Sequence, residues 1–408
     1  MEEWKKYKLG EITSKIGSGA TPKGGRDSYL GGNIALIRSQ NVLDFSFSKL
    51  GLAYINEVQA EKLSNVEVYE KDVLLNITGD SVARVCIVPN NVLPARVNQH
   101  VAIIRGNDKV DYRYLLYYLQ YIKPQLLSLS QGGATRNALT KKMIEELEVK
   151  MPSKGIQKEI VSILYALDSK IELNRRINDN LEQQAQALFK SWFVDNSNPN
   201  WEETSLSEVA SFVGGYSYTG EELTDCSNIA MATIKNFGRN GGFKADGFKE
   251  INPSAKLKEC HYANLFDILV AHTDLTQNAD VIGNAELLLT YGKYNSIIFS
   301  MDLVKVLPKE TFPYRFLLAA MLKNKLFKGH SLGYVNGTTV LHLSKKALPD
   351  FEIRKPSDSE SKMMDEVLAS YYKRMAELLQ ENDRLISLRD TLIPKLMSGK
   401  LKINDLNC

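Results

Sequence analysis

The chain has 408 residues, which is enough for two or three domains of ordinary size. Its content of 44% hydrophobic and 24% charged residues is typical of a soluble globular protein that can bury real cores. A net charge of +3 excludes a basic field over the whole surface, so any nucleic-acid contact must come from local clusters of Lys and Arg.

The first 152 residues predict short strands and one helix separated by loops. The segment 9–16 predicts a short helix, and a Gly-rich loop follows at 17–26. Residues 111–127 carry apolar side chains at helical spacing and predict a second helix. Short β-branched runs between Asn, Gly and Pro residues predict strands at 34–38, 72–78, 83–88 and 101–105.

A long helix is predicted from Gly155 to about Trp192. About 36 residues at roughly 1.5 Å each would make a rod of about 54 Å. A matching helix is predicted near the end of the chain, and both carry a seven-residue spacing that is typical of a coiled-coil seam. The predicted seam residues are Leu167, Asn174, Leu181 and Leu188 in the first helix and Tyr371, Leu378, Leu385 and Leu392 in the second. The polar Asn174 would fix the register, although an ordinary helical hairpin core explains the same stripes.

The chain repeats itself. An ungapped offset of 204 aligns Gly133–Asp195 with Gly337–Gly399, and fourteen positions in that frame are identical. The preceding parts correspond more loosely, with the offset drifting between 195 and 202. Two copies are too few for a solenoid and suggest a pseudo-two-fold molecule. The predicted boundaries are a first globular domain at 1–152, a helical region at 153–196, a second globular domain at 197–356 and a distal helical region at 357–408.

No catalytic signature is complete. The spacing of a phosphate-binding loop occurs at Gly215–Gly220, but Glu221 stands where the lysine belongs. The five histidines are scattered without metal-ligand spacing. Glu148–Lys150 resembles the end of a nuclease site, but its repeat partner is Glu352–Arg354 and no suitable acidic residue precedes it. We therefore predict no catalytic residue and no metal site, which favours a recognition protein.

The cellular location is predicted from what the sequence lacks. The start, Met1–Lys6, has no apolar signal-peptide core, and no run reaches the roughly 18 apolar residues of a membrane span. Cys86, Cys226, Cys260 and Cys408 are far apart and predict thiols rather than a disulfide or a zinc site. We expect a cytoplasmic protein.

Several motifs resemble those of the specificity subunit of type I restriction–modification enzymes. They are Gln157–Ile160, Leu167–Asn174 and Ala187–Phe193 in the first long helix, and Gly132–Arg136, Leu139–Lys142 and Pro152 ahead of it. The resemblance extends over essentially the whole length, from Trp4–Ile12 to Thr391–Gly399. It departs in the second repeat, where Ser361 replaces the glutamine and Pro394 stands in the place of Lys190.

The resemblance implies a non-catalytic subunit with an α+β fold. Two β-rich target recognition domains would each read one half of a bipartite DNA target, joined by two long antiparallel coiled-coil helices that set the spacer. Two methyltransferase subunits would dock on the helices, and two motor-nuclease subunits can join the complex. S-adenosylmethionine and ATP would bind to those partners, so this chain would need no cofactor. The alternative is a protein-interaction scaffold that does not bind specific DNA sequences.

Candidate DNA-contacting residues follow from residue type and loop position. Arg and Lys suit guanine or phosphate, whereas Asn and Gln suit adenine. The first-repeat candidates are Thr21, Lys23, Arg26, Arg38, Gln40, Asn41, Arg84, Arg96, Asn98, Gln99, Thr135, Arg136, Asn137, Lys141 and Lys142. The second-repeat candidates are Lys235, Asn236, Arg239, Asn240, Thr273, Gln277, Tyr334, Asn336, Thr338, Lys345 and Lys346. Each could instead be a solvated loop residue, and the recurring lysine pairs could contact a protein partner.

Overall fold

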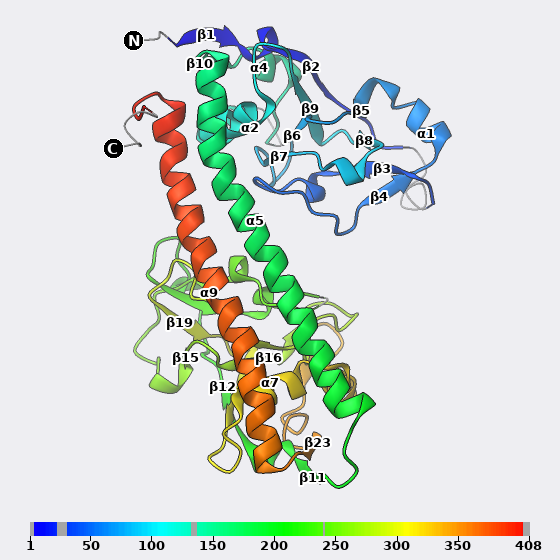
Figure 1. Ribbon diagram of the computed structural model, residues 1–408, viewed down its shortest axis with the longest axis vertical. Coiled ribbons are helices and arrows are strands. Elements are labelled where there is room, and N and C mark those ends of the chain that lie inside the picture. Colours follow the sequence, from blue (N-terminus) through cyan, green and yellow to red (C-terminus); the bar gives the residue numbers. More distant parts are fainter. Residues whose placement is uncertain (1–3, 23–30, 132–136, 240, 403–408) are drawn as a thin grey trace. The chain divides into compact units, whose positions relative to one another are not determined.

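The computed structural model describes residues 4–22, 31–131, 137–239 and 241–402. The chain forms two compact units: unit 1 is Met1–Lys170 with Leu385–Cys408, and unit 2 is Ile171–Arg384. The boundary between them falls inside the two long helices, α5 (Lys154–Lys190) and α9 (Asp358–Met397), which Figure 1 draws in green and orange-red. Each unit therefore contains a globular part and a segment of each helix.

Unit 1 contains two four-stranded sheets. The first has the order β2 (Thr13–Ser18), β9 (Val101–Gly106), β6 (Val73–Asn76) and β7 (Val85–Ile87). The second has the order β4 (Ala53–Ile55), β3 (Ile34–Ile37), β8 (Ala95–Val97) and β5 (Glu67–Val68), with β3 and β8 parallel. A separate pair joins β1 (Lys5–Lys8) to β10 (Glu148–Met151). The shorter helices are α1 (Glu57–Glu61), α2 (Tyr112–Tyr121), α3 (Lys123–Ser130) and α4 (Lys141–Glu145).

Unit 2 repeats this strand order. Its first sheet is β12 (Ala210–Gly214), β20 (Leu303–Pro308), β16 (Ile268–Ala271) and β18 (Ala285–Leu287). Its second is β14 (Lys249–Glu250), β13 (Ile229–Ala232), β19 (Ser296–Phe299) and β15 (Tyr262–Ala263), with β13 and β19 parallel. The pair β11 (Glu202–Ser205) and β23 (Glu352–Lys355) matches β1 and β10. The remaining elements are α6 (Leu206–Val209), α7 (Arg315–Leu322), α8 (Lys325–Leu332) and a small sheet of β17 (Thr273–Asp274), β22 (Leu341–Leu343) and β21 (Val335–Asn336). The predicted repeat is thus confirmed at the level of the sheets.

The central strand of each first sheet has core on both of its faces. In β6, Val73 and Leu75 pack in the cluster that contains the residues of α2, whereas Leu74 packs in the cluster that contains the second sheet. In β16, Ile268 and Leu269 divide between two clusters in the same way. A strand that is covered on both faces has a continuous run of apolar residues in its sequence, and both β6 and β16 have such a run.

Two predicted elements differ from the structure. Residues 9–16 were expected to be helical, but only Leu9–Glu11 forms a single 3-10 turn, and β2 begins at Thr13. Pairing with β9 explains this, because Ile16 lies opposite Ile104 in the sheet. The helix expected at 111–127 is divided at Ile122 into α2 and α3, because Pro124 in the first turn of α3 has no N–H to continue the earlier helix. The four strands predicted in this part are present within a few residues of their expected ends.

The segments of α5 and α9 bond to each other within each unit. In unit 1, Arg389 Nη1 lies 2.9 Å from Asp168 Oδ1. In unit 2, Asn178 Nδ2 donates to the Met375 carbonyl at 3.3 Å, and Asn382 Nδ2 donates to the Ile171 carbonyl at 3.4 Å. In unit 2, the later residue of α5 bonds to the earlier residue of α9, so the two helix segments there run in opposite directions.

The most buried stripe of the helices is not the predicted one. Asn174 and Leu378 are fully buried, whereas Leu167, Leu181, Leu188, Tyr371, Leu385 and Leu392 are half-buried. A second stripe three residues earlier is buried throughout; it consists of Leu164, Ile171, Asn178 and Ala185 in α5 and Leu368, Met375, Asn382 and Arg389 in α9. The two stripes together make the paired apolar positions of a heptad pattern. Hydrophobic spacing alone did not predict the second stripe, because Asn178, Asn382 and Arg389 in it are polar.

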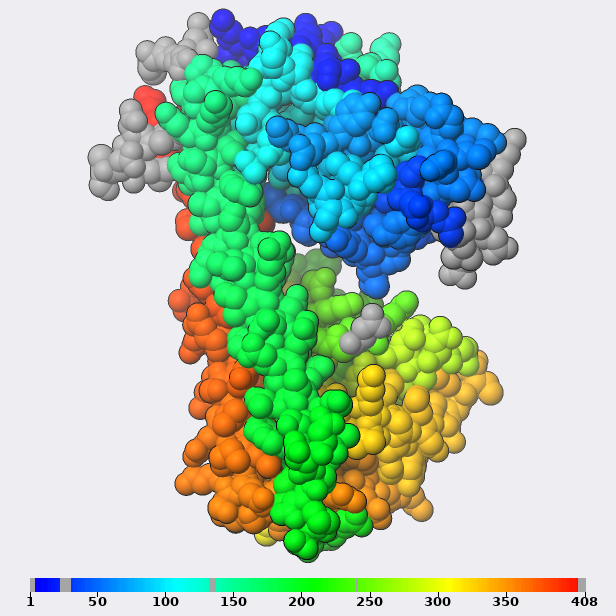
Figure 2. Space-filling view, turned by 45° about the vertical axis from the view of Figure 1, so that its right-hand side comes forward, coloured from blue at the N-terminus to red at the C-terminus, as the bar shows by residue number. Residues whose placement is uncertain are grey.

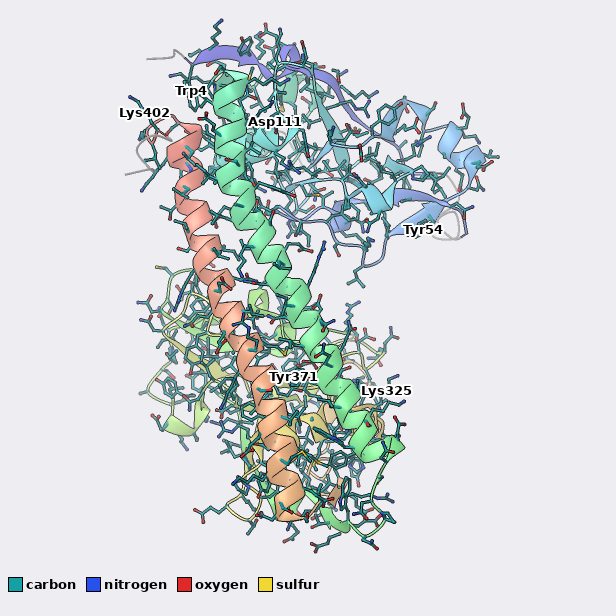
Figure 3. All side chains as sticks on the ribbon, viewed as in Figure 1. Trp4, Tyr54, Asp111, Lys325, Tyr371 and Lys402 are labelled. Carbon is teal, nitrogen blue, oxygen red and sulfur yellow. The ribbon has the colours of Figure 1, made fainter. Side chains whose placement is uncertain are left out.

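Three further features are plain in the described residues. No helix there has both the length and the apolar character that a membrane crossing needs. Cys86, Cys226 and Cys260 are free thiols, and Cys408 lies outside the described residues. The main-chain N–H of Asp111, which Figure 3 labels, donates to Gln157 Oε1 at 2.9 Å, so the glutamine of the first helix motif holds the start of α2 against α5.

Candidate nucleic-acid interface

In unit 1, four polar side chains form a chain of contacts at one end of the first sheet. The ends of β2 and β6 and the start of β9 meet there, because neighbouring strands in this sheet are antiparallel. Thr21 donates to Gln99, and Gln99 Nε2 lies 3.1 Å from His100 Nε2. His100 Nδ1 lies 2.5 Å from Thr78 Oγ1. Loops far apart in the sequence therefore present one polar edge.

The segment before α4 joins the same edge. The Gly79 N–H donates to the Asn137 carbonyl at 3.1 Å, and the Leu139 N–H donates to the Ile77 carbonyl at 2.8 Å. Lys141 and Lys142 follow at the start of α4 with exposed side chains, and Lys141 forms an ion pair of 3.4 Å with Glu145. The predicted residues Lys23, Arg26, Thr135 and Arg136 lie outside the described residues.

Unit 2 builds the corresponding edge. The His272 N–H donates to the Asp302 carbonyl at 2.8 Å, which matches the bond of 3.0 Å from Ile77 to His100 in unit 1. Thr273 Oγ1 donates to Asp302 Oδ1 at 3.0 Å, which matches the Thr78–His100 contact. The same backbone arrangement thus presents different side chains in the two units.

The loops around β17 complete the edge of unit 2. Gln277 Nε2 donates to the Thr338 carbonyl at 2.6 Å, and Asn336 pairs with His342 across β21 and β22. The side chains of Gln277, Asn336, Thr338, Lys345 and Lys346 are all exposed. Five of the predicted residues of the second repeat are therefore brought to one region.

The surroundings of two titratable side chains in this region shift their pKa values toward the uncharged form. Burial lowers the pKa of His272, and the neighbouring His342 and Lys345 lower it further. At Tyr334, a hydrogen bond of 3.1 Å to Asp350 Oδ2 raises the pKa of the phenol.

Within the described ranges, no group of three or more His, Cys, Asp or Glu side chains is arranged to hold a metal ion.

Asn41 and Asn236 were predicted to contact bases, but the structure contradicts this. Both side chains are 0% exposed, so a base edge cannot reach them. Asn41 accepts from the Arg38 N–H at 3.0 Å and donates to the Ser48 carbonyl at 2.9 Å. Asn236 accepts from the Thr233 N–H at 2.8 Å and donates to the Lys244 carbonyl at 2.7 Å. The two asparagines recur because they close the same turn in both units.

Three other predicted residues are also buried. Arg96 lies in β8 rather than in a loop, is 7% exposed, and forms an ion pair of 3.3 Å with Glu67. Asn98 is buried and its Oδ1 accepts from the His100 N–H at 3.0 Å. Thr273 is buried beneath Asp302. Asn98 and Thr273 hold residues of the polar edges in place, whereas Arg96 bonds to Ala60 and Glu67 beside the second sheet.

The remaining predicted residues lie away from these contacts. Arg38 Nη2 and Gln40 Nε2 both donate to the Gly51 carbonyl, at 2.5 Å and 3.0 Å. Arg84 is half-buried between β6 and β7. Lys235 is exposed, and Arg239 is exposed with an ion pair of 3.6 Å to Asp280. Asn240 lies outside the described residues.

Sequence reasoning missed Thr78, His100 and Asp302 as members of the two edges. The signal that could have found them is the drifting repeat. An offset of 195 pairs Thr78 with Thr273, and an offset of 202 pairs His100 with Asp302. Residue types alone did not single out these positions, because a threonine and an aspartate are common in loops.

Comparisons with known proteins agree with this architecture. A family model described as the type I restriction modification DNA specificity domain matches residues 1–183. The HindI specificity subunit of Haemophilus influenzae is 24% identical, covering 98% of this chain and 100% of that protein. The MjaIX specificity subunit of Methanocaldococcus jannaschii is 22% identical, and the match covers 99% of this chain and 95% of that protein. The crystal structure of an S subunit from M. genitalium has a TM-score of 0.53 at 16% identity, covering 97% and 96%, and shows a shared fold.

These matches confirm the resemblance predicted from the motifs. The fold is shared with the S subunit from M. genitalium, and the match to the DNA specificity domain covers the first 183 residues. Over its whole length, the chain is similar to specificity subunits of type I restriction–modification enzymes.

Proposed function

We propose that this chain reads a bipartite DNA target, with one half-site read by the polar edge of each unit. The observation that carries the proposal is the equivalence of the two edges. The same strand ends and the same hydrogen bonds recur in both units, yet the exposed side chains differ. Equal scaffolds with unlike side chains suit two half-sites of unlike sequence, because base-edge contacts carry the specificity.

The long helices supply the spacer and the docking surface in this proposal. Helix α5 has 37 residues and α9 has 40, so each is at least about 55 Å long at roughly 1.5 Å per residue. Figure 2 shows the green C-terminal part of α5 uncovered on the surface of unit 2. Two methyltransferase subunits would dock on such helix faces, and two motor-nuclease subunits would complete the restriction complex.

A cavity beside α5 supports a protein partner. It has a volume of about 520 Å³ in unit 2, and Phe189, Val194 and Leu326 contribute apolar walls. Lys190 and Lys325 lie at its margin, and Figure 3 labels Lys325 there. An apolar cavity edged with lysines suits an apolar side chain of a partner that also carries acidic residues.

The chemistry of modification and cleavage would belong to the partners. S-adenosylmethionine would bind to the methyltransferase subunits and ATP to the motor-nuclease subunits. This chain would act without a cofactor by placing the reading edges on DNA. Its contribution is positional and non-catalytic.

The test is a DNA-binding measurement on the chain assembled with its methyltransferase subunits. Footprinting should show two protected blocks separated by an unprotected spacer, and affinity should fall as salt rises. A scrambled duplex of equal composition is the control. If the assembled complex protects neither block, the alternative of a protein-interaction scaffold is favoured.

A further inference from the structure

The turn between β8 and β9 is equivalent to the turn between β19 and β20. In both, the first turn residue donates its N–H to the parallel neighbouring strand: Asn98 to the Ile37 carbonyl at 3.0 Å, and Ser300 to the Ala232 carbonyl at 2.9 Å. In both, the carbonyl of the third turn residue accepts from the segment after the central strand. Residues 98–100 and 300–302 are therefore counterparts, one residue for one residue.

Only the second and third residues of each turn face solvent. Asn98 and Ser300 are buried beneath the turn. Gln99 is exposed, and its counterpart Met301 is 53% exposed although it is apolar. His100 and Asp302 are half-buried.

The third residue of each turn is held by an equivalent threonine. Thr78 Oγ1 lies 2.5 Å from His100 Nδ1, and Thr273 Oγ1 donates to Asp302 Oδ1 at 3.0 Å. Each of these side chains is therefore oriented by its unit rather than free to rotate. An oriented polar group discriminates between bases better than a mobile one, because the freedom lost on binding has already been removed.

We propose that these two dipeptides, Gln99–His100 and Met301–Asp302, are the positions at which the two half-sites are read differently. The inference rests on the proposed function. In unit 1, the exposed Gln99 amide exchanges its contacts with Thr21 and His100 for N6 and N7 of adenine, and the His100 Nε2 atom that Gln99 leaves is then open to a base. In unit 2, the Met301 side chain packs on a thymine methyl group, and the Asp302 carboxylate accepts from the amino group of cytosine.

The structure also supplies controls at the other ends of the same strands. Asp108 follows the far end of β9, and Glu310 follows the far end of β20; both are exposed. Asp108→Asn and Glu310→Gln change the same kind of group in the same units. Neither is part of a polar edge, so both should leave the recognised sequence unchanged.

The experiment uses the full chain with its methyltransferase subunits and a library of duplexes with randomised half-sites. Sequencing of methylated adenines then reports the preference at every position. Gln99→Ala should lower discrimination about ten-fold or more at one position of one half-site. Asp302→Asn should do the same in the other half-site only. Circular dichroism of each variant verifies folding, and Gln99→Met and Asp302→Ser serve where a first variant does not fold.

The outcomes separate this inference from the function on which it rests. A folded Gln99 or Asp302 variant whose two half-sites are unchanged overturns the inference, and so does equal relaxation of both half-sites. A wild-type complex that shows no bipartite preference overturns the proposed function itself. A change confined to the expected half-site supports both.

Discussion

At the scale of single residues, burial separates the side chains that we propose to contact DNA from those that support the fold. Residue type favoured Asn41 and Asn236 equally with Gln99, but the first two are enclosed by main-chain partners and Gln99 is exposed. A buried amide needs hydrogen-bond partners from the protein, and once they are present the group has nothing left for DNA. Recurrence in both repeats therefore marks a folding role at these positions.

A buried charge in unit 2 is another supporting residue. Lys323 at the end of α7 forms ion pairs with Glu286 at 2.6 Å and Glu182 of α5 at 3.0 Å. Burial alone would lower the pKa of Lys323, but Glu286 and Glu182 raise it well above its usual value. The charged lysine thus ties the first sheet of unit 2 to α5.

Lys323→Met tests this tie. Removing the cation leaves two carboxylates without their partner in a buried place, so unit 2 should lose about 3–5 kcal/mol of unfolding free energy. The measurement is urea denaturation followed by circular dichroism. Lys325→Met, an exposed neighbour, should change stability by less than about 0.5 kcal/mol. Equal behaviour of the two variants would show that the ion pairs contribute nothing.

At the scale of elements, buried amides join α5 and α9 inside unit 2. Asn178 and Asn382 are repeat partners, and each donates to the main-chain carbonyl of the other helix. Asn174 Nδ2 donates to Asn382 Oδ1 at 2.9 Å. Buried polar groups in a helix seam favour one register, because any other alignment leaves them unsatisfied.

Asn382→Ala should weaken this seam. The substitution removes the bond to Ile171 and leaves the Asn174 amide without one acceptor, so the cost should be about 1–3 kcal/mol of unfolding free energy. Urea denaturation of the full chain measures it. Asn180→Ala, on an exposed face of α5, is the matched control and should be nearly neutral. An unchanged midpoint for Asn382→Ala would argue against a role in register.

At the scale of the whole molecule, the chain consists of two copies of one design. Both units use the same order of strands in two sheets and the same pairing of first and last strands. The ungapped frame with fourteen identities covers the helices and the segments before them, whereas the first parts differ by insertions. Similar packing segments with unlike loops suit the proposed reading of two unlike half-sites, because loops tolerate substitution better than cores.

The proposed spacer role predicts the effect of lengthening both helices. Duplicating one heptad in α5 and one in α9 preserves the seam pattern and adds about 10 Å to each helix. The tolerated spacer should then grow by about three base pairs at roughly 3.4 Å each, as read by methylation of targets with graded spacers. Lengthening α5 alone breaks the pairing of the seam and should abolish methylation. If the tolerated spacer were unchanged in the variant with both insertions, the helices would not set the spacer length.

The sequence was sufficient to predict the repeat, the four strands of the first globular part and the long helices. Each of these depends on local signals: apolar spacing, β-branched runs and turn residues. It was not sufficient at 9–16, where pairing with β9 overrides a helical pattern, nor for the second buried stripe, where Asn178, Asn382 and Arg389 interrupt the hydrophobic spacing.

The two polar edges also depend on contacts between residues that are far apart in the sequence. Thr21, Thr78, Gln99 and Asn137 come from four separate segments, and only the antiparallel pairing of β2, β9 and β6 brings their loops together. Sequence alone indicated the resemblance to a family and the duplicated design, because motifs and periodicities are local. Only the tertiary structure decided which polar residues are exposed, because burial depends on neighbours that are distant in the chain.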